Sequence, residues 1–197
     1  IGTGKKAGIF KLDENGNIIS SNNSNNSNSS EGDKNSFEIY TSETTEQEIK
    51  LEKFYNLLIE WNQKINLTRI VEKEDVYLKH FYDSLTIKKV VDLSKIETLC
   101  DVGTGAGFPG IVLKIVYPNL KITLVDSLLK RVNYLNVIIK ELELENIKAI
   151  HTRGEDLKET FDIVTARAVA NIEKLLIYTM HLVNKNGLLI AMKGNID

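Results

Sequence analysis

The sequence has little cysteine, no excess of basic residues and no long apolar run, and each shortage excludes a class of protein. Its 197 residues contain one cysteine, Cys100, so no disulfide can form within the chain. No apolar run is long enough to span a bilayer, and no signal-like segment opens the chain. Lys and Arg number 25 against 27 Asp and Glu, which is not the basic balance typical of nucleic-acid-binding proteins. We therefore expect a cytoplasmic protein without membrane contact, in which any nucleic-acid contact comes from a local patch.

Composition divides the chain into three zones. Residues 1–42 form a head with a weak hairpin around Asn15-Gly16 and an Asn/Ser tract over 20–30, which we expect to be disordered linker because it has nothing to bury. Residues 43–95 are predicted to be helical, opening with a capping box at Thr45 and Glu48. Residues 96–197 alternate short apolar strands with helices.

The alternation in the last zone predicts a doubly wound, Rossmann-like α/β fold with the helical zone as an N-terminal extension. Strands are expected at 98–102, 121–126, 147–151, 162–165 and 188–192, and helices near 109–117, 128–142 and 172–183. A further helical stretch is expected near 72–90, with a break near Asp83. Buried strands that alternate with helices form parallel sheets, whose ligands lie beyond the carboxyl ends of the strands.

The segment 99–110 (LCDVGTGAGFPG) joins the first of these strands to a helix through a glycine-rich loop. Gly105, Gly107 and Gly110 fit G-x-G-x-x-G, the fingerprint of dinucleotide sites. Asp101, Gly103, Gly105 and Gly107 fit D-x-G-x-G-x-G, a pattern typical of S-adenosylmethionine sites. Glycines suit either ligand, because the backbone must take positive φ and approach the ligand closely. A glycine turn without a ligand is the third interpretation.

Local chemistry favours the second interpretation. A dinucleotide places its anionic pyrophosphate on backbone N–H groups at the helix N-terminus. Asp101 at the strand end and Pro109, which lacks an N–H, both oppose an anion there. S-adenosylmethionine carries a sulfonium and an ammonium, so a carboxylate is favourable to it. Asp126, at the end of the next strand, has the spacing of an acid that bonds a ribose, although it could also cap the next helix.

Seven segments together resemble the GidB/RsmG family, the small-subunit rRNA methyltransferases that act on a guanine N7. They are LIEWNQKINLT (58–68), KHFYDSL (79–85), DVGTGAGFPGI (101–111), LVDSLLKR (124–131), HTRGED (151–156), FDIVTARAV (161–169) and AMKG (191–194). They follow the family's order and spacing from about residue 44 to residue 194. The glycine loop is shared by many methyltransferases, whereas EWNxKINLT with KHFxDSL is much more restrictive.

The resemblance implies S-adenosylmethionine as cofactor and a set of residues that bind it. The expected cofactor-binding residues are Asp101, Gly103, Gly105, Gly107, Phe108, Asp126, Gly154, Glu155 and Arg167. Gly154 stands where the family usually has Ala, a small change that we expect to be tolerated. The family also continues with further strands beyond the last residue here, so we expect an incomplete sheet with an exposed edge.

The resemblance also implies small-subunit rRNA, or the small ribosomal subunit, as partner of a monomeric enzyme. Arg167 and Lys193 are expected to orient the reactants at the rim of the site, without a general base. An N7 lone pair needs no deprotonation, and the sequence shows no metal-binding spacing. His80 and Asp83 are expected on the substrate side, although pairing with each other for structure is the simpler interpretation of these two. Arg131 is expected to brace the loop or contact RNA.

Two alternatives come from other classes of protein. The G-x-G-x-x-G match leaves an NAD-dependent oxidoreductase open. The absence of a dedicated catalytic base leaves a non-catalytic cofactor-binding or ribosome-assembly module open. Comparing the affinity for NAD with that for S-adenosylhomocysteine tests the first alternative. Measuring methyl transfer to small ribosomal subunits tests the second.

Overall fold

The structure is a computed structural model that describes residues 7–12, 18–22, 45–167 and 172–192. Lys193, the Asn15-Gly16 turn and the Asn/Ser tract after Asn22 lie outside the described residues.

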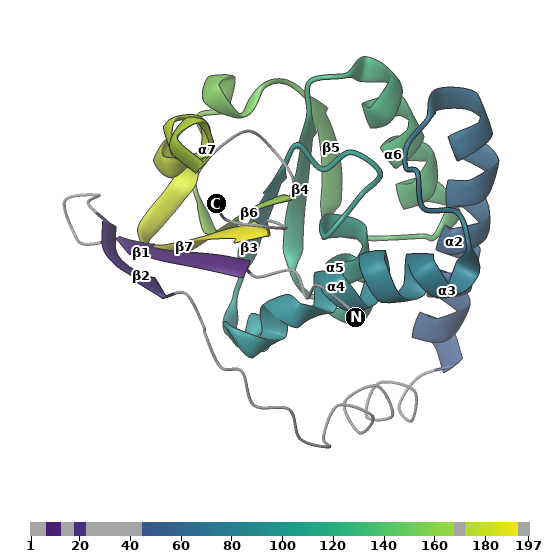
Figure 1. The fold of residues 1–197 in the computed structure, drawn as a ribbon, viewed down its shortest axis with the longest axis horizontal. Coiled ribbons are helices and arrows are strands. Elements are labelled where there is room, and N and C mark those ends of the chain that lie inside the picture. Colours follow the sequence, from purple (N-terminus) through teal and green to yellow (C-terminus); the bar gives the residue numbers. More distant parts are fainter. Residues whose placement is uncertain (1–6, 13–17, 23–44, 168–171, 193–197) are drawn as a thin grey trace.

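A seven-stranded sheet in the order β2-β1-β7-β6-β3-β4-β5 forms the centre of the fold (Figure 1). Its parallel part consists of β3 (Thr98–Val102), β4 (Lys121–Asp126), β5 (Ile147–His151), β6 (Phe161–Arg167) and β7 (Val183–Met192). The first three have the bounds expected from sequence, while β6 and β7 are longer than expected. The chain runs outward from β3 to β5 and then returns to β6 on the other side of β3, so the strand order reverses beside β3. Ligands bind at such reversals in open α/β sheets.

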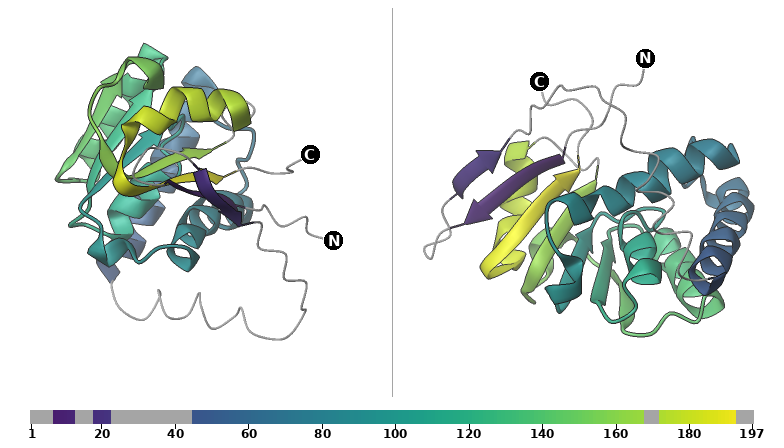
Figure 2. Two further views of the ribbon diagram at one scale, coloured as in Figure 1. Left: turned by 90° about the vertical axis from the view of Figure 1, so that its left-hand side faces the viewer. Right: turned by 90° about the horizontal axis from the view of Figure 1, so that it is seen from below.

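Alternate residues of the strands face two separate hydrophobic cores, as the period of two in a strand requires. Leu99 of β3 joins the core that contains residues of α2 (Thr45–Ile65), α5 (Gly110–Val116) and α6 (Leu129–Glu141). Its neighbour Cys100 joins the other core, against which α7 (Ile172–Thr179) and the following 3-10 turn pack. Helices therefore cover both faces of the sheet (Figure 2), and Cys100 is a buried apolar residue whose thiol pKa is raised by burial.

The helical zone packs on the first of these faces. Phe54 and Leu58 of α2 are fully buried, and Leu51, Trp61 and Ile65 pack beside them. The 72–90 stretch changes helical type along its length: α3 (Lys73–Val76), a π-helical turn (Tyr77–Tyr82), α4 (Asp83–Leu85) and a 3-10 turn (Thr86–Lys89). π-helical turns occur often at functional sites, and this one carries His80. Among the described residues, no helix is both long and apolar enough to cross a membrane.

Two strands near the start of the chain extend the sheet. β1 (Ala7–Leu12) and β2 (Ile18–Asn22) form an antiparallel pair, and β1 pairs antiparallel with β7 from Ala7 opposite Met192 to Lys11 opposite Leu188. The expected exposed edge at the last parallel strand is therefore wrong over residues 188–192, where β1 pairs with β7 (Figure 1). The first three residues of the Asn/Ser tract belong to β2, contrary to the expected linker.

Candidate active site

The glycine loop lies between β3 and α5, at the carboxyl end of the sheet. Its backbone is anchored to the neighbouring strand, because the N–H groups of Gly103 and Thr104 donate to the carbonyl of Val125 at 2.8 and 3.1 Å. Gly105 has φ +60°, and a Cβ there would come no nearer than 3.9 Å to another atom. At Gly107 (φ +95°) a Cβ would lie 2.6 Å from Ile111 Cγ1. Gly105 thus faces open space, whereas Gly107 is required for packing.

Asp101 lies beneath this loop and is fully buried. Its Oδ2 accepts hydrogen bonds from the Thr104 hydroxyl at 2.7 Å and from the Gly110 backbone N–H at 3.0 Å, and its Oδ1 accepts one from the Thr165 hydroxyl at 3.0 Å. Burial raises the pKa of this carboxyl, against the effect of the hydrogen bonds. Both carboxylate oxygens hold the loop and the neighbouring strand, and the expected contact of Asp101 with the cofactor stays a prediction.

The hydrogen bond from the Gly110 N–H to Asp101 also prevents an anion from binding at the start of α5. Pro109 is the N-cap and has no N–H, the N–H of Gly110 is bonded to Asp101, and the N–H of Ile111 donates to the Gly107 carbonyl at 2.8 Å. A pyrophosphate needs unoccupied N–H groups there and no nearby carboxylate. The structure therefore argues against the dinucleotide interpretation of the loop, for a more specific reason than the sequence offered.

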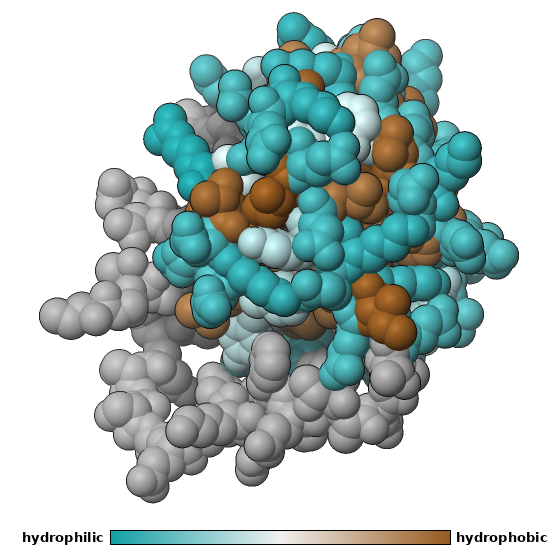
Figure 3. Space-filling view, turned by 90° about the vertical axis from the view of Figure 1, so that its right-hand side faces the viewer, coloured by the Kyte–Doolittle hydropathy of each residue, from teal (hydrophilic) through white to brown (hydrophobic). Residues whose placement is uncertain are grey.

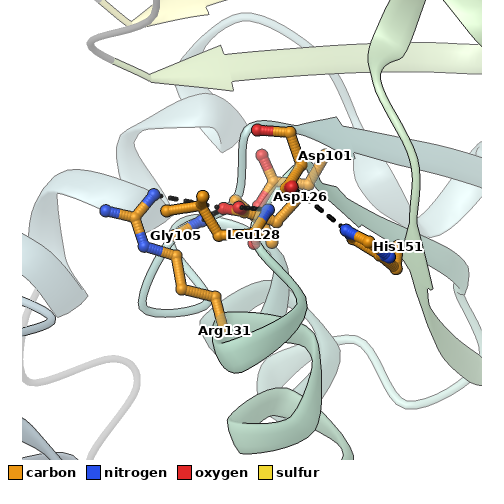
Figure 4. A network of polar contacts seen from close by, with 8 residues as sticks. Asp101, Gly105, Asp126, Leu128, Arg131 and His151 are labelled. Atoms are coloured by element: carbon orange, nitrogen blue, oxygen red, sulfur yellow. Dashed lines mark hydrogen bonds and ion pairs between the residues drawn. The ribbon is translucent and has the colours of Figure 1, made fainter. Parts of the chain in front are cut away.

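Asp126, at the end of β4, joins the loop to α6 (Figure 4). Its Oδ2 accepts from the Gly105 N–H at 3.0 Å and lies 3.4 Å from Arg131 Nη1, and its Oδ1 accepts from the Leu128 N–H at 2.9 Å. The hydrogen bond from Leu128 shows that the Asp126 carboxylate stabilises the start of α6. The same carboxylate also borders the cavities at the strand ends. His151, at the end of β5, bonds the Ser127 carbonyl through Nε2 at 3.1 Å.

Two cavities meet at Gly103, Asp126 and Ser127. The first, here called the β5-side cavity, has a volume of about 210 Å³. It is lined by the strand ends and by Thr152, Arg153, Gly154, Glu155, Tyr178 and Thr179. The second, here called the loop cavity, has a volume of about 360 Å³ and is lined by the loop together with Leu67, Thr68, His80, Arg131 and Arg167. Small-molecule sites typically exceed roughly 300 Å³; the loop cavity alone reaches that size, and the β5-side cavity lies next to it across the three shared lining residues.

Sequence reasoning missed part of this lining. Tyr178 and Thr179 come from α7 and reach the β5-side cavity because Gly154 allows close approach: a Cβ at Gly154 would lie 2.9 Å from Val102 Cγ1 and 3.1 Å from the Tyr178 carbonyl oxygen. No local signal marks either residue. Thr68, by contrast, ends the EWNxKINLT segment, so that segment could have pointed to it.

Phe108, Arg167 and the π-helical turn form the wall of the loop cavity. The His80 ring stacks on Phe108 with centroids 4.5 Å apart, and the Arg167 guanidinium carbon lies 4.9 Å from the Phe108 centroid. Arg167 Nη1 lies 3.4 Å from Asp83 Oδ2, with both side chains largely buried. Burial lowers the pKa of Arg167, and the carboxylates of Asp83 and Asp101 oppose that shift. Asp83 contacts Arg167, and His80 contacts the Thr68 hydroxyl. The expected pairing of His80 with Asp83 stays a prediction.

A larger apolar groove of about 730 Å³ lies elsewhere, between α2 and the 73–89 segment. It contains none of the loop residues and none of the strand ends. The side of the molecule that carries α2 is mainly hydrophilic with several apolar patches (Figure 3). We place the candidate site at the strand ends, because the loop, the Asp126 carboxylate and the basic side chains meet there. Among the described residues, no group of His, Cys, Asp and Glu could hold a metal ion.

The fold and the site define an α/β protein of the class I methyltransferase type. A solved Staphylococcus aureus structure, described as a candidate caffeoyl-CoA O-methyltransferase, is similar over 80% of this chain and 71% of its own, with TM-score 0.54 and 15% identity. The solved structure of a mutant of MtNAS is similar over 74% of this chain and 58% of its own, with TM-score 0.51 and 15% identity. At such identity these structures show the fold alone.

The chain belongs to the GidB family, described as rRNA small subunit methyltransferase G, whose profile matches residues 47–197. A relative of that name from Macrococcus caseolyticus is 51% identical over 156 residues, covering 77% of this chain and 66% of the relative. The Bacillus subtilis protein of the same name is 47% identical over 173 residues, covering 81% and 72%. The chain thus spans about two thirds of the length of these relatives.

Proposed function

We propose that this protein is an S-adenosylmethionine-dependent methyltransferase that methylates N7 of a guanine in small-subunit rRNA. The observation that carries the proposal is the pair of cavities that meet at Gly103, Asp126 and Ser127, beside a helix start that Asp101 closes to anions. Membership of the GidB family and the names of the relatives support the substrate.

The two cavities suit the two ends of such a cofactor. Adenosine would lie in the β5-side cavity, with Asp126 toward the ribose hydroxyls and Gly154 and Glu155 on the adenine side. The methionine end would lie in the loop cavity, against Gly105 and Phe108. The Asp126 carboxylate borders both cavities, so it lies where the two parts join.

The chemistry requires the protein to orient rather than to remove a proton. The cofactor supplies an electrophilic methyl group on a sulfonium. Guanine N7 has an in-plane lone pair and no proton, so in-line attack needs no general base, and proximity accounts for most of the catalysis. Arg167 can donate to O6 of a guanine, which leaves the N7 lone pair free for the methyl group, and His80 and Asp83 fix the surroundings of Arg167. We also propose that Lys193 helps to orient the reactants, as expected from the sequence. Lys193 lies outside the residues that the structure describes.

Basic side chains near the cavities would contact the RNA phosphates. Arg131 borders the loop cavity with one third of its side chain exposed, and Arg153 borders the β5-side cavity with 71% exposed. Phosphate contacts position a protein on RNA and make binding sensitive to salt. We propose that the enzyme works in the cytoplasm as a monomer; light scattering of the purified chain checks the monomer, and cell fractionation checks the location.

The test is transfer of label from methyl-labelled S-adenosylmethionine to unmethylated small subunits and to naked rRNA. We expect label in one of these, released on digestion as 7-methylguanosine. Label in another nucleoside contradicts the N7 assignment, and absence of label contradicts the enzyme. A parallel titration should show tighter binding of S-adenosylhomocysteine than of NAD; the reverse order would restore the oxidoreductase interpretation.

A further inference from the structure

The turn that follows α2 is held by one side chain, that of Asn62. Its amide oxygen accepts hydrogen bonds from the backbone N–H groups of Leu67 at 2.6 Å and Thr68 at 2.8 Å. Asn66 within the turn has φ +50° and donates its N–H to the Asn62 carbonyl at 3.1 Å. These bonds direct the chain back toward the sheet and bring Leu67 and Thr68 to the loop cavity.

Thr68 connects this turn to the aromatic wall of the cavity. Its Oγ1 accepts from the Ile70 N–H at 3.1 Å and lies 2.9 Å from His80 Nε2. A hydroxyl offers one donor and two acceptor positions, so the two contacts leave one position for a ligand. The His80 ring stacks in turn on Phe108 of the glycine loop. The EWNxKINLT segment therefore reaches the cofactor loop through Thr68 and His80.

We propose that Thr68 contacts the target purine directly, and that Asn62 is a positioning residue that places Thr68 for this contact. The inference rests on the proposed function and adds residues to its substrate side. The loop, Asp126 and Ser127 supply one side of the loop cavity, and Leu67, Thr68 and His80 supply another. Because the first side belongs to the proposed cofactor, the second is left for the substrate.

The chemistry of this second side suits a base. A guanine that presents N7 to the methyl group keeps O6 on the same edge as a hydrogen-bond acceptor. Arg167 and the Thr68 hydroxyl border the same cavity as the His80 and Phe108 rings. A guanine in this part of the cavity therefore lies beside the Arg167 guanidinium, which can donate to O6, and beside the Thr68 hydroxyl.

The experiment compares substitutions at Thr68 and Asn62 in the full chain. Thr68→Val removes the hydroxyl at nearly constant size, and Thr68→Ser retains it. Asn62→Ala removes the acceptor that holds the turn, and Asn62→Asp retains an acceptor oxygen. Asn56→Ala, at an exposed position of the same helix, is the matched control. Each variant is measured for unfolding midpoint, affinity for S-adenosylhomocysteine, and kcat and KM for methylation of small-subunit rRNA.

We expect Thr68→Val and Asn62→Ala to lower kcat/KM for RNA about tenfold or more, the effect of one lost hydrogen bond of about 1.4 kcal/mol. Affinity for S-adenosylhomocysteine should stay within about twofold of the parent value, since its contacts lie across the cavity. Thr68→Ser, Asn62→Asp and Asn56→Ala should resemble the parent chain. An unchanged kcat/KM in Thr68→Val would overturn the inference, as would an equal loss of cofactor affinity.

A binding measurement separates this inference from the proposed function. Guanosine 5′-monophosphate is titrated into protein saturated with S-adenosylhomocysteine and followed by saturation-transfer NMR. We expect binding by the parent chain and by Thr68→Ser, and loss of signal in Thr68→Val. Thr68-dependent binding without methyl transfer to any RNA would contradict the proposed function and leave the base site standing. Methyl transfer to RNA together with nucleotide binding that is unchanged in Thr68→Val would support the proposed function and contradict the role of Thr68.

Discussion

The Oδ2 atom of Asp101 lies 3.0 Å from the backbone nitrogen of Gly110, so a buried strand-end carboxylate holds the first turn of α5. This contact and the bond from Thr104 fix both ends of the glycine loop to one side chain. The loop is thereby shaped before any ligand binds, which reduces the ordering cost of binding.

Replacement of Asp101 tests this role. In Asp101→Ala the Gly110 N–H and the Thr104 hydroxyl lose their acceptor, while the Thr165 hydroxyl keeps the Cys100 carbonyl at 3.4 Å. Each buried group left unsatisfied costs about 1–3 kcal/mol. We expect a large loss of stability in urea unfolding together with weaker binding of S-adenosylhomocysteine. Asp101→Asn keeps an acceptor oxygen and should retain most of both. Full stability in Asp101→Ala would show that the loop is held by other contacts.

The pH dependence of Asp101→Asn gives a second, separate prediction. Burial raises the folded-state pKa of Asp101 above its ordinary value of 3.8. The unfolded chain therefore releases this proton at lower pH than the folded one, and the carboxyl's contribution to stability falls as pH rises above about 4. Asn does not titrate, so the free energy of unfolding of Asp101→Asn should improve relative to the parent chain as pH rises from about 4 to about 7. A difference that is constant, or that moves the other way, contradicts the raised pKa.

Gly105 and Gly110 should respond differently to the same added methyl group. A Cβ at Gly105 meets nothing nearer than 3.9 Å, so Gly105→Ala has mainly the strain of φ +60°, of order 1 kcal/mol, and puts a methyl group into the loop cavity. A Cβ at Gly110 would lie 2.2 Å from Leu124 Cδ2 and 3.0 Å from Asp101 Oδ2. We expect Gly105→Ala to lose cofactor affinity with little loss of stability, and Gly110→Ala to lose roughly 1–3 kcal/mol of stability or more. Calorimetric titration and urea unfolding measure the two effects, and equal patterns in both variants would contradict the assignment.

Arg167 should be separated from its ion pair with Asp83 by a double-mutant cycle. Arg167→Ala leaves a largely buried Asp83 carboxylate without this partner, so the single variant should lose stability as well as activity. In Arg167→Ala with Asp83→Asn the uncompensated charge is gone, and we expect much of the unfolding free energy to return. Methyl transfer should stay low in the double variant, because the guanidinium is still absent. Recovery of methyl transfer in the double variant would reduce Arg167 to a structural residue.

Gly154→Ala should narrow the β5-side cavity. The new methyl group would lie 2.9 Å from Val102 Cγ1 and 3.1 Å from the Tyr178 carbonyl oxygen, so the Val102 side chain and the end of α7 must both adjust. We expect roughly 1–3 kcal/mol of lost stability and weaker binding of S-adenosylhomocysteine. Thr152→Ala, which lines the same cavity without such a contact, is the control. Unchanged stability in Gly154→Ala would show that α7 adjusts freely, and that the Gly154 position tolerates Ala here as the family pattern suggests.

The elements of the α/β zone could be predicted because their signals are local. Buried strands such as Thr98–Val102 are short apolar runs, and the glycines of the loop indicate where the backbone takes positive φ. The pairing of β1 with β7 could not be predicted, because it joins distant parts of the chain such as Ala7 and Met192. The backbone hydrogen bonds between them do not depend on which side chains are present. The π-helical turn at His80 was missed for a similar reason, since no apolar period distinguishes it from the helix on either side.

The sequence by itself determined the fold class, the loop and the acids at the ends of the first two parallel strands, since each depends on residue type at a fixed local spacing. The tertiary structure alone decided what those acids do. Asp101 is the last but one residue of β3 and Asp126 ends β4. Both carboxylates accept hydrogen bonds within the fold, yet Asp126 borders the two cavities and Asp101 borders neither. The difference arises from what packs around each strand end: Thr104, Gly110 and Thr165 surround Asp101, whereas a cavity lies on each side of the Asp126 lining position.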